Sequence, residues 1–165
     1  MDGIVAITVT FNDYAYLEKA IESLRAQTIP VAKIIIVDNN SNEEACAKLR
    51  QQEDEQLEVL WLKENLGGAG GFEAGMQYAA KKYDPDWYWL MDADACPRLD
   101  CLEKLIAHAK DVASPGILAP LIYGKDFQKY QLYHHKVLSR FLDRDLQKYQ
   151  NVEEIPAVSE IERCV

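Results

Sequence analysis

The stretch KIIIVDNNS, residues 33–41, decides the fold. Its first part, Lys33 to Val37, is a short run of apolar, mostly β-branched residues without the polar alternation of a half-exposed strand. Such a run is typical of a strand that is covered on both faces, as in a parallel sheet between layers of helices. The polar residues 38–41 then stop the strand, so a cluster of side chains able to bind a ligand lies at its carboxyl end.

The segments on either side of this strand alternate between strand and helix patterns. Ile4 to Phe11 (IVAITVTF) predicts a strand, and the spacing of apolar residues in Tyr16 to Ala26 predicts a helix. After the central strand, Glu43 to Gln52 predicts a charged helix and Leu57 to Lys63 (LEVLWLK) an alternating strand. The order is therefore strand, helix, strand, helix, strand.

The same alternation continues downstream. A glycine-rich loop leads to a helix over Phe72 to Lys82, and Trp87 to Met91 (WYWLM) predicts a fourth strand. A helix over Leu99 to Lys110 and a strand over Ile117 to Ile122 follow. This βαβαβαβαβ order predicts an α/β fold with a mostly parallel sheet, whose ligands bind outside the carboxyl ends of the strands.

The last forty residues show a weaker pattern. Gln128 to Gln150 contains five apolar residues at helical spacing, namely Val137, Leu138, Phe141, Leu142 and Leu146, and Ser159 to Val165 begins a strand. We expect an α/β core over residues 1–125 and the start of a further, truncated portion over residues 126–165, which would leave an apolar face open to self-association.

Composition excludes several classes of function. The chain has 165 residues with 18 Lys+Arg and 27 Asp+Glu, so its net charge is −9, which disfavours binding to nucleic acid and to anionic membranes. No apolar run approaches the roughly 18 residues of a membrane span, and an acid stands where a signal peptide has a basic flank. We therefore expect a soluble, cytoplasmic protein. The 4 cysteines have no spacing typical of zinc or of a disulfide framework.

Asp92-Ala93-Asp94, directly after the fourth strand, is the strongest candidate for a metal site. Two carboxylates one residue apart can face one hard divalent cation, Mg²⁺ or Mn²⁺, and such a cation neutralises the charge that develops on a diphosphate leaving group. The alternative is an acidic cluster that caps the following helix.

Asp38 and the glycine-rich segment are candidates for nucleotide binding. Asp38 can accept hydrogen bonds from a base imide or a ribose hydroxyl, although Asp-Asn-Asn-Ser is also a turn and helix cap. The backbone around Gly67 and Gly68 can offer N–H groups to phosphate, or the glycines only allow a helix to pack closely on the sheet. The segment matches neither the P-loop nor the dinucleotide fingerprint.

The motifs VTFN (9–12), VDNNS (37–41), ENLGGAGGF (64–72) and WLMDADACP (89–97), in this order, resemble the nucleotide-binding half of the family 2 inverting glycosyltransferases, which have the GT-A fold. The last two motifs resemble the branch that contains rhamnosyltransferases and galactofuranosyltransferases. By this resemblance, Thr10 and Asn12 line the base pocket, Asp38 reads the base or ribose, and Asn65 lies beside the nucleoside. Asp92 and Asp94 form the DxD pair that holds the metal and diphosphate.

The resemblance implies a metal-dependent, inverting transfer of a sugar from a UDP- or dTDP-sugar donor to a saccharide or lipid-linked acceptor, in the synthesis of cell-surface polysaccharide. In this family the acceptor segment and the carboxylate that acts as general base lie beyond Val165, so residues 126–165 begin the acceptor side and this chain holds the donor site. Parts absent from the chain could hold it at the inner face of the membrane.

Two alternatives remain open from the residues. A sugar nucleotidylyltransferase uses a similar sheet but needs a basic, glycine-rich loop after the first strand, where this chain has FNDYAY (11–16). A binding module without catalysis, such as a nucleotide-sugar sensor, would use the same donor-side residues. His134 and His135 could offer a base, but adjacent histidines in a charged segment are more often a solvated surface.

Overall fold

The computed structural model describes residues 3–111, 116–120, 136–139, 142–145 and 162–164. The chain divides into two compact units, Met1–Leu99 and Asp100–Val165. The predicted boundary near residue 125 falls in a stretch outside the described residues and stays a prediction.

The first unit has the predicted alternation of strands and helices. Its elements are β1 (Ile4–Thr10), α1 (Tyr14–Arg25), β2 (Lys33–Asp38), α2 (Glu43–Arg50), β3 (Leu57–Trp61), α3 (Gly67–Tyr83) and β4 (Trp87–Asp92). The strands form one sheet in the order β3-β2-β1-β4, and every neighbouring pair is parallel. The predicted α/β class is confirmed.

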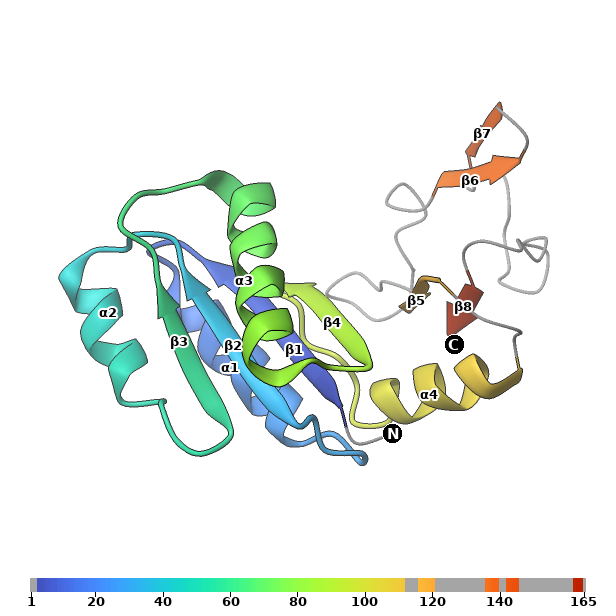
Figure 1. Cartoon of the computed structure of the whole chain (residues 1–165), viewed down its shortest axis with the longest axis horizontal. Helices are drawn as coiled ribbons and strands as arrows, with labels where there is room; N and C mark the ends of the chain where they lie inside the picture. Colours follow the sequence, from blue (N-terminus) through green and yellow to red (C-terminus); the bar gives the residue numbers. More distant parts are fainter. Residues whose placement is uncertain (1–2, 112–115, 121–135, 140–141, 146–161, 165) are drawn as a thin grey trace. The chain divides into compact units, whose positions relative to one another are not determined.

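The central strand is covered on both faces, as its apolar run predicts. The four residues Ile34, Ile35, Ile36 and Val37 are all 0% exposed. Figure 1 shows α3 on one face of the sheet and α1 on the other, where α1 buries Leu17 and Ile21 among its apolar residues. Two helical layers therefore remove the central strand from water, and the apolar surface that they bury stabilises the fold.

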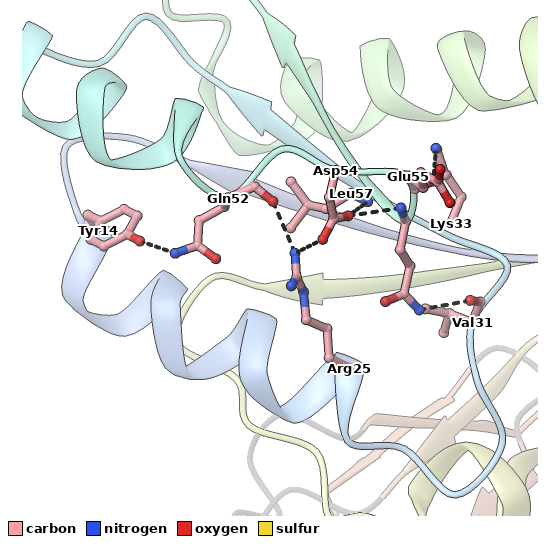
Figure 2. Close-up of polar contacts among 9 residues, drawn as sticks. Tyr14, Arg25, Val31, Lys33, Gln52, Asp54, Glu55 and Leu57 are labelled. Carbon is pink, nitrogen blue, oxygen red and sulfur yellow. Dashed lines mark hydrogen bonds and ion pairs between the residues drawn. The ribbon is translucent and has the colours of Figure 1, made fainter.

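A polar network fixes the edge of the sheet at which the strands begin (Figure 2). Arg25, at the end of α1, forms an ion pair of 2.8 Å with Asp54 and donates to the Gln52 carbonyl at 3.0 Å. Asp54 also accepts the Leu57 N–H at 2.7 Å, and this bond lowers the pKa of the Asp54 carboxyl against the opposing effect of burial. The loop before β3 is thereby tied to α1, on the edge opposite the polar motifs.

The second unit contains α4 (Cys101–Asp111), β5 (Leu118–Pro120), β6 (Lys136–Ser139), β7 (Leu142–Asp145) and β8 (Glu162–Cys164). β5 pairs in parallel with β8, and β6 pairs antiparallel with β7. The strand predicted to begin near Ser159 is thus present as β8. None of the helices in the described part of the chain is long and apolar enough to cross a membrane.

Of the five apolar residues at helical spacing in the last part of the chain, Val137 and Leu138 lie in β6 and Leu142 in β7, while Phe141 and Leu146 lie outside the described residues. Short apolar runs fit both the helical and the strand period. One predicted element was wrong. The glycine-rich segment is no loop: α3 begins at Gly67 and includes every glycine of the run. Glycine weakens an isolated helix, so the start of α3 depends on its packing against the sheet.

Candidate functional site

The carboxyl ends of β1, β2 and β4 bring three candidate residues to one edge of the sheet. In the strand register Thr10 lies opposite Asp38, and the preceding residue of β1, Val9, lies opposite Asp92. Parallel strands all end at the same edge, so the sequence prediction that these motifs share one edge is confirmed by the register.

The turns after β1 and β2 are held to each other by hydrogen bonds. The Asn12 N–H donates to Ser41 Oγ at 2.9 Å, and Asn12 Oδ1 accepts the Asn42 N–H at 2.7 Å. Asn12 and Asn40 both have positive φ, 60° and 64°, a conformation that asparagine tolerates better than most residues. Asn12 therefore shapes the rim of the site, and its exposed side chain already has a structural contact.

Asp38 lies at the end of β2 and is only 2% exposed. Its Oδ2 accepts the Ser41 N–H at 3.0 Å and the Cys46 thiol at 3.8 Å, so the turn that the sequence suggested as an alternative role is present. Burial, with the nearby Asp38 charge, raises the pKa of the Cys46 thiol. Asp38 Oδ1 is buried and has no hydrogen-bond partner among the described residues. A buried carboxylate oxygen without a donor is costly, and a ligand N–H or O–H would satisfy it.

Asn39 is a site residue that the sequence prediction missed. It is 3% exposed, its backbone N–H donates to the Thr10 carbonyl at 2.9 Å, and its side chain reaches the start of α3. Asn39 Oδ1 accepts the Leu66 N–H at 2.8 Å, and Asn39 Nδ2 donates to the Gly67 carbonyl at 3.1 Å. The polar cluster after β2 was the only sequence signal, and it does not reveal which of its members is buried.

The start of α3 is held by the side chain of Asn65, two residues before Gly67. Asn65 Oδ1 accepts the Gly67 N–H at 2.8 Å, and Gly67 has a φ of 71°. Gly67 and Gly68 are exposed, and a Cβ at either would meet nothing within 4 Å. The N–H groups that follow in the first turn of a helix have no partner within the helix, so they remain able to bind an anion.

Asp92 is the last residue of β4, and Asp94 follows in a turn closed by the Ala95 N–H and the Asp92 carbonyl at 3.1 Å. Both side chains are exposed. Within the described ranges, no three His, Cys, Asp or Glu side chains come together as a complete metal site. Two carboxylates still fit Mg²⁺ or Mn²⁺, since such ions commonly take one or two carboxylates and complete their coordination with substrate phosphates and water.

Comparison with known proteins gives a consistent set of matches. The sequence profile of the family described as Glycosyl transferase family 2 matches residues 5–159. The protein named galactofuranosyltransferase GlfT1 from Mycobacterium tuberculosis is 34% identical over 94 residues, which are 56% of this chain and 31% of that protein. Its namesake from Mycolicibacterium smegmatis is 32% identical over 123 residues, 74% of this chain and 40% of that protein. The chain thus spans about a third of these relatives' length.

Solved structures with the same fold include S. aureus TarS 1-349 in complex with UDP, at a TM-score of 0.63 and 19% identity over 81% of this chain and 40% of that one. The mannosyltransferase PcManGT from Pyrobaculum calidifontis, in complex with GDP-Man and Mn²⁺, matches at a TM-score of 0.59 and 20% identity over 75% of this chain and 36% of that one. At these identities the likeness concerns the fold.

Proposed function

Because the chain belongs to glycosyl transferase family 2 and has the GT-A fold, we propose that it binds the nucleotide-sugar donor, a UDP- or dTDP-sugar, of an inverting sugar transfer that depends on a divalent metal. The whole protein would transfer this sugar to a saccharide or lipid-linked acceptor in the synthesis of cell-surface polysaccharide. Relatives named galactofuranosyltransferase support the sugar-transfer part of this proposal.

One observation gives the main support for the proposed donor site. At the carboxyl edge of the sheet, a buried carboxylate oxygen, Asp38 Oδ1, has no donor among the described residues, while the loops around it are fixed by hydrogen bonds. The imide N–H of uracil or thymine is a donor of the kind that this oxygen lacks. In the proposal, Asp38 therefore accepts the base imide, and Thr10 and Asn12 line the base pocket.

The diphosphate would lie between the start of α3 and the end of β4. The N–H of Gly67 is already bonded to Asn65, so it is not free to meet a phosphate. The N–H of Gly68, next along the helix, would meet a phosphate oxygen instead. Asn65 itself would lie beside the nucleoside, as in the family that the chain resembles. Asp92 and Asp94 would hold Mg²⁺ or Mn²⁺. The bound ion would neutralise charge on the leaving diphosphate. The structural neighbour PcManGT was solved in complex with GDP-Man and Mn²⁺, which supports the same class of cation here.

The negative charge of the chain indicates that a bound diphosphate would need a cation. With a net charge of −9, the chain offers a diphosphate little attraction of its own. The charged residues among the proposed donor-side set, Asp38, Asp92 and Asp94, are all carboxylates, so the negative charges of a diphosphate would be repelled there without a metal.

Calorimetry with UDP, dTDP and GDP in the presence of Mn²⁺ tests the proposed donor class. The proposal expects UDP and dTDP to bind and GDP to bind at least about tenfold more weakly, which corresponds to 1.4 kcal/mol. Equal binding of the three nucleotides would mean that the base is not read. No binding of any of them would contradict the donor site itself.

A further inference from the structure

Asn39 makes three hydrogen bonds that join three separate segments. Its backbone N–H reaches the carbonyl of Thr10 at the end of β1, at 2.9 Å. Its side-chain oxygen and nitrogen reach the backbone of two consecutive residues, Leu66 at 2.8 Å and Gly67 at 3.1 Å, which lie 27 and 28 residues later in the chain.

The side chain therefore holds the start of α3 at two points. One bond goes to a backbone donor and the next to a backbone acceptor, which fixes the orientation of this stretch of chain as well as its position. Asn39 follows Asp38 directly, and its own side chain is 3% exposed, although Leu66 and Gly67 are exposed residues. Loss of these bonds would therefore leave the buried amide group of Asn39 unpaired, which is costly.

Only an amide fits this arrangement. Asparagine offers one acceptor and one donor from the same planar group, and both are used here. Aspartate has the same shape and could still accept from Leu66, but it has no hydrogen to donate to the Gly67 carbonyl. An ionised carboxylate would instead place a negative oxygen against that carbonyl.

We propose that Asn39 is a positioning residue for donor binding: it holds the backbone at the start of α3, which would meet the diphosphate, in place beside Asp38, which would meet the base. This inference rests on the proposed function. It assigns neighbouring residues different roles, one in contact with the nucleotide and one acting through the backbone of residues 66–68. A donor bound across this edge would meet both parts already in position.

Amide hydrogen exchange in the ligand-free chain tests the positioning directly. The Leu66 N–H should exchange slowest in the wild type, faster in Asn39→Asp and fastest in Asn39→Ala, with a total change of about tenfold. Asn40→Asp is the matched control, because it adds the same charge one residue away on an exposed side chain. Exchange at Leu66 that stays unchanged in both Asn39 variants would overturn the inference.

Calorimetry with Mn²⁺ and either UDP or inorganic diphosphate tests the consequence for binding. Asn39→Ala and Asn39→Asp should weaken both ligands by the same factor, about five- to tenfold, with Asn40→Asp unchanged. Asp38→Asn should weaken UDP and leave diphosphate unchanged. Binding is measured at a temperature where circular dichroism shows each variant folded, so a lower stability alone does not produce this contrast.

The failure of the proposed function gives a different result. A wild-type chain that binds neither ligand contradicts the donor site, and the exchange rates at Leu66 then decide the positioning by themselves. If the wild-type chain binds both ligands, two results would overturn the positioning role of Asn39. In one, the Asn39 variants bind both ligands as tightly as the wild type does. In the other, they lose affinity for UDP alone.

Discussion

Gly71 of α3 lies so close to Val9 of β1 that a Cβ added at Gly71 would stand 2.5 Å from Val9 Cγ1. A similar contact occurs one turn later, where a Cβ at Gly75 would be 2.7 Å from Ile7 Cγ2. Both glycines are buried on the face of α3 that packs on the sheet. The glycine run thus has two parts, with exposed residues at the start of the helix and packing residues after them.

Gly71→Ala should therefore destabilise the fold by about 1 to 3 kcal/mol, the usual cost of overpacking a well-packed core. Gly68→Ala is the matched control, because a Cβ there meets nothing within 4 Å and alanine favours a helix. Urea denaturation of the two variants measures the difference. Equal stability of the two would mean that α3 can move away from β1 without cost.

Thr8 lies in β1 with 0% exposure, and its hydroxyl has no hydrogen-bond partner among the described residues. Thr8→Val removes this unpaired polar group and keeps the shape, so the free energy of unfolding should rise by about 1 kcal/mol. Thr8→Ser keeps the hydroxyl and loses a methyl group, and should be destabilising. A loss of stability in Thr8→Val on denaturation would show that the hydroxyl has a partner after all.

Glu58 on β3 accepts hydrogen bonds from Lys82, Tyr78 and Tyr83 of α3. Burial opposes its charge, but these three donors outweigh burial and lower the pKa of the carboxyl from 4.5 to about 2. A lowered pKa in the folded state means that the stabilisation is complete above the ordinary value and is lost as the pH falls from 4.5 towards 2.

Glu58→Gln should accordingly lower stability at pH 7 by about 1 to 2 kcal/mol, a value reduced for solvent screening of Lys82, and the gap to wild type should close on acidification. Thermal unfolding from pH 7 to pH 2.5 measures this gap. Glu44→Gln is the control, because its ion pair with Lys48 is exposed and contributes little. A gap that is constant with pH would contradict the role of the Glu58 charge.

Asp38→Asn keeps an oxygen for the Ser41 N–H but can present an amide donor where a nucleobase imide would need an acceptor. Binding of UDP should weaken by about 1.5 to 3 kcal/mol, the size expected for a hydrogen bond to a charged group. Calorimetry with UDP and with inorganic diphosphate separates a contact to the base, which only UDP has, from contacts to the phosphates, which both ligands have. If both ligands lose affinity equally, Asp38 acts only through the turn.

Much of the first unit could be predicted because its signals are local. The apolar run at 34–37 required cover on both faces, and all four residues are fully buried. The alternation of LEVLWLK and the acids after WYWLM likewise placed β3 and the end of β4. The edge that the polar motifs share then followed from the general rules of parallel sheets, whereas the strand order β3-β2-β1-β4 is known only from the structure.

What could not be predicted depends on contacts between distant segments. A run of glycines favours a loop until the closeness of β1 is known, so the start of α3 was misplaced. Asn39 and Asn40 are the same residue type in neighbouring positions, so the sequence alone does not distinguish them. In the structure Asn39 is buried and bonded to Leu66, whereas Asn40 is exposed. The roles of Thr10, Asn12, Asp38, Asn65, Asp92 and Asp94 towards a ligand stay predictions.

The measurement that tests the central claim most directly is the affinity of the chain for UDP in Mn²⁺ and in EDTA, for the wild type, for Asp94→Asn and for the exposed control Asp86→Asn. The account predicts that wild type and Asp86→Asn bind UDP at least about tenfold more tightly with Mn²⁺, a difference of 1.4 kcal/mol, and that Asp94→Asn loses this gain while remaining folded. Equal affinity in Mn²⁺ and in EDTA for the wild type would contradict a metal-dependent donor site.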